Sequence, residues 1–188
     1  GSSGWLCEHV YQHYEYTNDV EYLRETAYPL MKKAAEFYLD ILVEYDGKLV
    51  LAPGTSPENT FIYEGKPCSV GKYTTMSMSI ARELFENCVK ACEVLGGDAE
   101  FAATLKDTLG KLAGFKLGSE GQLLEFDDDY PEREIHHRHV SHLYALHPAN
   151  IITVDGTPEL AAACRKTLER RGDNGTGWSL GWKINFWA

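Results

Sequence analysis

The chain has 188 residues, of which 44% are hydrophobic and 24% are charged, and its formal net charge at pH 7 is −10. This composition is typical of a globular domain that can bury a sizeable core. It argues against nucleic acid as a partner, because phosphate binding needs a basic surface and no run of lysine or arginine occurs. No apolar stretch approaches the roughly 18 residues of a membrane span.

The first part of the chain predicts two helices and a turn. Apolar residues recur at three- and four-residue steps from Trp5 to Tyr16 and from Val20 to Tyr45, so we expect a helix over each range. Pro29 lies inside the second range, where it would either kink the helix or begin it. Asp46-Gly47 predicts a tight turn, and Lys48 to Leu51 a short extended piece.

The segment from Leu51 to Phe61 contains two prolines, a glycine and a single ionisable side chain, Glu58. It predicts a shaped loop, and loops carry function more often than the elements that they join. A lone carboxyl among apolar and hydroxyl neighbours suits a general acid. Thr55 and Glu58 also have capping-box spacing, and Ser56-Pro57 fits an N-cap before proline, so a plain helix start stays open. Ile62 to Lys72, which follows, is predicted to be irregular.

Two further helices are expected at Tyr73 to Leu95 and at Ala99 to about Leu112. Asp98 is expected to cap the second of them. The chain has five cysteines and no Cys-x-x-Cys pair, which indicates neither a disulfide framework nor a zinc knuckle. Cys88 and Cys92, four residues apart, are expected to be core thiols rather than metal ligands.

The last third of the chain mixes loops and helices. Short β-like pieces are expected between Phe115 and Phe126. Asp127 to Asp129 is expected to be a solvated loop, because the oxygen spacing of a calcium loop is absent. A short helix is expected at Val140 to Leu146, another from Thr157 to about Arg171, and a last one from Thr176 onward.

The expected architecture is all-α, with almost no strand. Successive helices are joined by short turns and predict antiparallel hairpins. Such hairpins, with short strands and long loops at one end, indicate a segment of a helical toroid or solenoid.

The densest chemistry lies between Ile135 and Leu143, where four histidines and an arginine occur. His139 and His142 are three residues apart, which would place them on one face of a helix. A metal site would need a third ligand, and no His-Glu-x-x-His pattern supplies one. We therefore favour hydrogen bonding by Arg138 and His139, to sugar hydroxyls or within the structure, over metal binding.

Five motifs follow one another along the chain. They are Gly4-Trp5-Leu6-Cys7-Glu8-His9, Thr55-Ser56-Pro57-Glu58-Asn59, Gly121-Gln122-Leu123-Leu124-Glu125, His137-Arg138-His139-Val140-Ser141-His142-Leu143-Tyr144-x-Leu146-His147-Pro148 and Gly175-Thr176-Gly177-Trp178-Ser179-Leu180-x-Trp182-Lys183. Together they resemble the α-L-fucosidases of glycoside hydrolase family 95, over nearly the whole chain. The resemblance implies an (α/α)6 toroid, with residues 1–188 part of a single catalytic domain that is truncated at both ends.

The same resemblance implies an inverting hydrolase of α-L-fucosides, typically with Fucα1-2Gal ends. Inverting enzymes place an acid and a base about 6.5–9.5 Å apart, so that a water fits between them. The family's general acid is placed at Glu58, with Glu125 as the runner-up. The asparagines and the aspartate that activate the water would lie outside this chain, so the 188 residues alone are expected to be nearly inactive.

The sugar site that the resemblance implies consists of Trp5, Asn59, Arg138 and His139. The expected partners are a fucosylated oligosaccharide and the rest of the same catalytic domain, with no cofactor and no metal. Family members that act on host or plant glycans are often exported, so a periplasmic or secreted location is expected.

Some positions depart from the family pattern. Ser77 and Ser79 stand where an acidic residue and a glutamine are expected, and Phe126 stands where tryptophan is expected. These changes allow an altered preference, including α-L-galactosides, on which some members act. A glycoside phosphorylase ranks lower, because only Lys72 and Arg138 suit a phosphate pocket. A non-catalytic helical module that binds carbohydrate is the remaining alternative.

Overall fold

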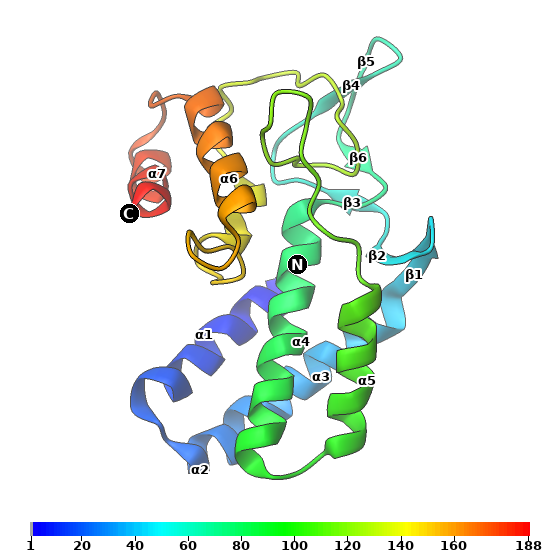
Figure 1. The fold of residues 1–188 in the computed structure, drawn as a ribbon, viewed down its shortest axis with the longest axis vertical. Helices are drawn as coiled ribbons and strands as arrows, with labels where there is room; N and C mark the ends of the chain where they lie inside the picture. Colours follow the sequence, from blue (N-terminus) through cyan, green and yellow to red (C-terminus); the bar gives the residue numbers. More distant parts are fainter. Residues whose placement is uncertain (1) are drawn as a thin grey trace. The chain divides into compact units, whose positions relative to one another are not determined.

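The computed structural model describes residues 2–188, which form two compact units. The first unit contains the chain up to Leu51 together with Ile80–Ala113. The second contains Ala52–Ser79 and Gly114–Ala188. The chain passes from one unit to the other three times: after Leu51, within helix α4 and after Ala113. Each unit therefore contains two segments that are distant in sequence, which Figure 1 distinguishes by colour.

The first unit is mainly helical, as predicted. Its helices are α1 (Ser2–Thr17), α2 (Val20–Tyr22), the π-helical turn η1 (Leu23–Ala27), α3 (Tyr28–Ile41), most of α4 (Thr75–Leu95) and α5 (Ala99–Lys111). Figure 1 shows α4 and α5 running side by side in opposite directions across a short turn. The largest fully buried side chains of this unit come from η1, α3, α4, α5 and the strand at Lys48–Leu51, and include Leu23, Met31, Tyr38, Val50, Ile80, Phe85, Cys88 and Leu105.

Pro29 stands in the first turn of α3, the predicted alternative in which it begins a helix, but α3 follows the preceding turn without a break. The helix instead widens to a π-turn over Leu23–Ala27, and the N–H of Tyr28 bonds the carbonyl of Leu23, five residues back. Proline lacks an N–H and its ring crowds the carbonyl four residues before it, here that of Glu25. A π-turn placed just before the proline relieves that crowding.

The prediction that this helix continues to Tyr45 is wrong. It ends at Ile41, and β1 (Leu42–Tyr45) pairs antiparallel with β2 (Lys48–Leu51). Asp46 and Gly47 both have positive φ, 51° and 68°, as a two-residue hairpin turn requires. Pairing with β2 supplies the backbone hydrogen bonds that a longer helix would have made.

Two details of the first unit differ from the sequence prediction. The buried face of α1 consists of Gly4, Cys7, Glu8 and Tyr11, and the apolar Leu6 is exposed. Gly4 belongs to this face because any side chain there would meet Tyr38 and Ile80. A small residue, not the apolar stripe alone, therefore decides which side of α1 packs inward.

Asp98 precedes α5 but does not cap it with its side chain. Its carboxylate instead accepts bonds from the Tyr28 hydroxyl and the Lys32 ammonium, both at 2.6 Å. Cys88 and Cys92 are buried, as predicted, and the Cys92 thiol bonds the same Tyr28 hydroxyl at 3.1 Å. Asp98 thus ties α3 to the turn between α4 and α5.

The second unit contains more strand than the sequence predicted. Strands β3 (Gly54–Thr55) and β6 (Val70–Gly71) pair antiparallel, as do β4 (Phe61–Tyr63) and β5 (Lys66–Cys68). The segment predicted to be irregular is therefore largely a hairpin. No helix starts at Ser56-Pro57, since the chain turns there and enters β4.

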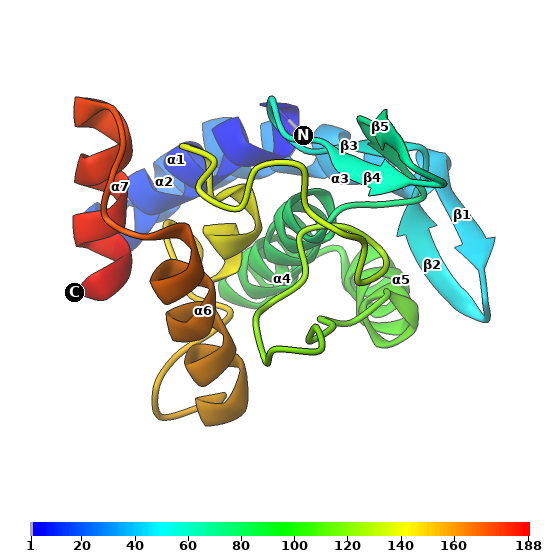
Figure 2. The same ribbon diagram turned by 90° about the horizontal axis from the view of Figure 1, so that it is seen from above.

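The helices of the second unit follow the sequence prediction more closely. They are the 3-10 helix η2 (Ser141–Ala145), α6 (Pro158–Arg171) and α7 (Gly177–Trp187), and Figures 1 and 2 both show α6 beside α7. Their shared core contains Leu123, Val140, Leu143, Ala145, Ile152, Ala163, Cys164, Leu168 and Phe186. Helices with a few short strands are thus confirmed as the fold class, and the toroid stays a prediction.

Asp127 is not part of a solvated loop. It is 3% exposed, and its carboxylate accepts bonds from the Lys72 backbone at 3.0 Å and from the Tyr130 hydroxyl at 3.2 Å. The Lys72 ammonium lies 3.4 Å away and supplies the counter-charge. Asp128 and Asp129, in contrast, are exposed as predicted.

Among residues 2–188, no helix combines the length and the apolar character needed to cross a bilayer.

Candidate active site

Glu58 stands at the tip of the loop that joins β3 to β4. Its φ of 57° lies in the left-handed region that side chains other than glycine rarely adopt. Its side chain is 58% exposed, whereas those of Ser56 and Asn59 on either side are buried. The loop therefore presents one carboxyl to the surface and turns Ser56 and Asn59 inward.

The Glu58 carboxylate meets the histidine-rich segment 80 residues further along the chain. Its Oε2 accepts a bond from the Arg138 guanidinium and lies 3.2 Å from Nε2 of His139. Both contacts are made to the same oxygen. The structure thus brings together the predicted acid and two of the residues predicted to bind the sugar.

Hydrogen bonds to the backbone of Arg138 and His139 fix the position of this segment. The Ser179 hydroxyl of α7 donates to the Arg138 carbonyl at 2.6 Å. The His139 N–H donates to Nδ1 of His137 at 3.1 Å, which requires that nitrogen to be unprotonated. Burial lowers the pKa of His137 and so keeps this ring neutral. The ring of Trp178, itself exposed, lies 4.7 Å from that of His139.

Glu125 lies beneath the loop, 8% exposed, and accepts hydrogen bonds at both of its oxygens. Oε1 accepts from the Ser56 hydroxyl and, at 3.4 Å, from that of Ser141. Oε2 accepts from Nδ2 of Asn59 and from Arg171, both at 2.7 Å. All the polar capacity of this carboxylate is therefore used inside the protein.

The pKa of Glu125 reflects competing effects. Burial acts to raise it, but the Arg171 guanidinium and the bonds from Ser56 and Asn59 outweigh burial, so the pKa lies below its ordinary value. Burial also lowers the pKa of His142 to about 4, so His142 is neutral at pH 7. Arg171 is therefore the charged partner of Glu125 at neutral pH.

His139 and His142 do not share a helical face, contrary to the prediction. The 3-10 helix begins only at Ser141, so His139 turns toward Glu58 while His142 is buried with Nδ1 3.8 Å from Glu125. Nowhere in residues 2–188 do three or more histidine, cysteine, aspartate or glutamate side chains gather as a metal site needs.

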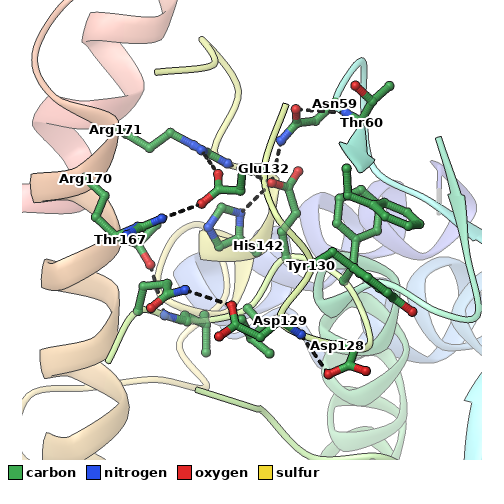
Figure 3. Close-up of a pocket in the computed structure, with 16 residues that line it drawn as sticks. Asn59, Thr60, Asp128, Asp129, Tyr130, Glu132, His142, Thr167, Arg170 and Arg171 are labelled. Carbon is green, nitrogen blue, oxygen red and sulfur yellow. Dashed lines mark hydrogen bonds and ion pairs between the residues drawn. The ribbon is translucent and has the colours of Figure 1, made fainter. Parts of the chain in front are cut away.

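Arg171, the last residue of α6, links Glu125 to the segment that precedes the histidines. Besides Glu125, it donates to the Glu132 carboxylate and to the Ile135 carbonyl, the latter at 2.7 Å. Figure 3 shows Arg170 and Arg171 both directed at Glu132. Glu132, His142, Arg170 and Arg171 line a pocket together with Asn59 and Thr60 of the Glu58 loop.

The remaining predicted residues fall in different places. Trp5 is half-buried on α1, in the first unit, and its contact with sugar stays a prediction. Both ends of the Asn59 amide have partners inside the protein: its Oδ1 accepts the Thr60 N–H at 2.9 Å and its Nδ2 donates to Glu125. Ser79 is fully buried, with its hydroxyl bonded to the Thr75 carbonyl, so it presents no polar group to a ligand.

Sequence reasoning missed several residues that build this site. Arg171 was seen only as the end of a helix. Ser179 and Lys183 are four residues apart on α7, and Lys183 donates to the carbonyls of Gly172 and Asn174 at 2.6 and 2.9 Å. Two polar residues at helical spacing in a helix with three tryptophans were the signal that could have found them.

Comparisons with known proteins identify the family of the chain. Residues 1–188 match the family described as the glycosyl hydrolase family 95 catalytic domain. The chain is similar to Alpha-L-fucosidase 2 of Arabidopsis thaliana, 42% identical over 98% of this chain and 22% of that protein. It is also similar to Probable alpha-fucosidase A of Aspergillus niger, 34% identical over 100% of this chain and 25% of that protein. The chain thus spans no more than a quarter of the length of these relatives.

Proposed function

The chain belongs to the glycosyl hydrolase family 95 catalytic domain family, and from that premise we propose that it carries the general acid and part of the sugar site of an inverting α-L-fucosidase. The natural substrates would be glycans with Fucα1-2Gal ends. The groups that activate the water, and the rest of an (α/α)6 toroid, would be supplied by residues outside this chain. Export to the periplasm or out of the cell remains a prediction.

The observation that carries the proposal is the meeting of Glu58 with Arg138 and His139. The three side chains come from two motifs 80 residues apart and converge on one carboxylate oxygen. A carboxyl on an exposed loop tip can reach a glycosidic oxygen, and adjacent guanidinium and imidazole groups can donate to sugar hydroxyls. When a sugar binds, its hydroxyls would therefore replace the Glu58 carboxylate as the hydrogen-bond partners of Arg138 and His139.

In the proposed reaction, a water attacks the anomeric carbon of fucose from the face opposite to the leaving group. The bond from that carbon to the galactose oxygen breaks, and Glu58 gives its proton to the departing oxygen. The proton of the water passes to the base outside this chain. The products are fucose of inverted configuration and the shortened glycan.

Glu58 fits the acid role better than Glu125 does. Glu125 is buried, accepts four hydrogen bonds and has a lowered pKa, so it neither reaches a substrate nor holds a proton readily. Glu58 is exposed, and its neighbours are suited to binding sugar. The exposed Trp178 beside His139 offers a ring for a sugar to stack on.

The test uses the complete protein and 2'-fucosyllactose. Loss of a general acid typically lowers the rate by about 10²–10⁴-fold, and we expect Glu58→Gln to lower kcat by that amount. Glu64→Gln is the matched control, because Glu64 is also an exposed glutamate at a loop tip with positive φ, 50°. An unchanged rate in Glu58→Gln would refute the acid assignment.

Two alternatives give different results in the same assay. An enzyme with altered preference would release galactose from an α-L-galactoside and little fucose from 2'-fucosyllactose. A non-catalytic binding module would bind the glycan without releasing any sugar, and it would tolerate Glu58→Gln. Proton NMR of the first product formed shows its anomeric configuration and so tests inversion.

A further inference from the structure

We propose that the buried Glu125–Arg171 pair is a positioning device that fixes the Glu58 loop against the Arg138–His139 segment. The inference rests on the proposed function, because it concerns how the same acid is aimed. It assigns Glu125 and Arg171 as positioning residues, and it gives Asn59 a place in this device rather than in contact with the sugar.

The first part of the device is a two-sided hold on the loop. Glu125 accepts a bond from Ser56, two residues before Glu58, and from Asn59, one residue after it. The two bonds go to different oxygens of a single carboxylate. The Asn59 N–H also closes the turn onto the Ser56 carbonyl at 3.4 Å. Both ends of the turn that carries Glu58 are thus anchored to one buried group.

Such a hold suits the conformation of the loop tip. Glu58 has a φ of 57°, which residues with a side chain rarely adopt, so bonds to the residues around it help to keep it there. Glu125 fixes Ser56 on one side of Glu58 and Asn59 on the other, and so fixes the shape of the loop between them. Without Glu125, the tip would relax toward ordinary backbone angles and redirect its carboxyl.

The second part of the device holds the opposite segment. Arg171 donates to the Ile135 carbonyl at 2.7 Å, three residues before Arg138. The same guanidinium donates to Oε2 of Glu125 at 2.7 Å. The loop of the acid and the segment of its two partners are therefore joined through one buried ion pair, in which both residues are less than 10% exposed.

Glu125 is in turn fixed by its own backbone. Its carbonyl accepts the Thr75 N–H at 3.0 Å, at the start of α4. Thr75 also donates its hydroxyl to the Leu124 carbonyl at 2.5 Å. The carboxylate that anchors the loop is thus attached to a long helix, which suits a part that must not move during the reaction.

The test separates aiming of the acid from general stability by changing the leaving group. Lactose leaves 2'-fucosyllactose readily only if its departing galactose oxygen receives a proton, whereas fluoride leaves α-L-fucosyl fluoride with little need of an acid. A misplaced acid should therefore slow the first substrate and spare the second. A protein that is merely less stable should lose activity on both substrates equally.

We expect Glu125→Gln in the complete protein to lower kcat on 2'-fucosyllactose by about 100-fold, the effect of a displacement of about 1 Å, with a far smaller loss on the fluoride. Ser56→Ala removes one of the anchoring bonds at little risk to folding and should shift the ratio of the two rates in the same direction by a smaller factor. If Glu125→Gln does not fold, the ratio of the two rates in Ser56→Ala alone tests the positioning role.

Asp127→Asn is the matched control. Asp127 is a buried carboxylate two residues away that bonds neither Ser56 nor Asn59, so its loss should leave the ratio of the two rates unchanged. Equal losses on both substrates in Glu125→Gln and Ser56→Ala would overturn the positioning role.

Glu58→Gln in parallel keeps the two proposals distinguishable. If it slows 2'-fucosyllactose far more than the fluoride while the Glu125 and Ser56 variants do not, only the positioning role fails. If Glu58→Gln itself shows no such difference, the proposed acid fails and the positioning role falls with it.

Discussion

Replacement of Arg171 by methionine should destabilise the protein through Glu125. Arg171 is 3% exposed and donates to Glu125, to Glu132 and to the Ile135 carbonyl. Methionine fills much of the same volume but leaves a buried carboxylate without its counter-charge. Breaking a buried pair from one side costs about 3–5 kcal/mol, and we expect Arg171→Met to lower the free energy of unfolding at pH 7 by that amount.

The sign of the pH dependence follows from the pKa of Glu125. In the natural protein this pKa is lowered, so the stability that the carboxylate contributes is present above its unfolded pKa and is lost as the pH falls through the folded value. In Arg171→Met, burial without the guanidinium raises the pKa, and protonation then relieves the penalty. The destabilisation should therefore be largest at neutral pH and should shrink as the pH approaches that of carboxyl titration.

Urea unfolding of the complete protein, with the natural chain, Arg171→Met, Glu125→Gln and the double variant, measures these terms. Glu125→Gln removes the charge that Arg171→Met leaves unpaired, so the double variant should lose less stability than the sum of the single variants. Glu132→Gln serves as a control, because this second partner of Arg171 is more exposed. Additive losses, or a penalty that grows on acidification, would refute the reasoning.

Two further substitutions test the loop and the surface beside it. A methyl group at Gly54 would come within 2.8 to 2.9 Å of backbone atoms of Tyr73 and Thr74, so Gly54→Ala should cost about 1–3 kcal/mol of unfolding free energy by overpacking, and an unchanged urea midpoint would contradict this. Trp178→Ala should raise KM for 2'-fucosyllactose by about tenfold with a smaller change in kcat, as loss of a stacking contact predicts. Trp187→Ala is its control, since Trp187 is equally exposed, at 48%, at the far end of α7, and equal KM changes in both variants would count against a specific platform.

The sequence predicted most helices, because their apolar residues recur at the helical period and their ends carry glycine or proline. The ranges predicted for α1, α4, α5 and α6 agree with the structure within about three residues, as such patterns allow. Lys48 to Leu51 was predicted to be extended and is β2, whereas β3 to β6 were missed because two- and three-residue strands have too little sequence to show a period of two. The end of α3 was misjudged because pairing with β2, a tertiary effect, outweighed the local pattern.

The sequence by itself also determined the family, through five short motifs in order, and it singled out Glu58, Arg138 and His139. It could not show that these three side chains meet, since 80 residues separate them and only folding brings their segments together. It ranked Glu58 ahead of Glu125 only through the family resemblance, because both follow turns within motifs. The different environments of the two glutamates came from the tertiary structure, which encloses Glu125 with Arg171 and leaves Glu58 at the surface. The cost of burying an unpaired charge is the physical reason that Glu125 is enclosed together with a guanidinium.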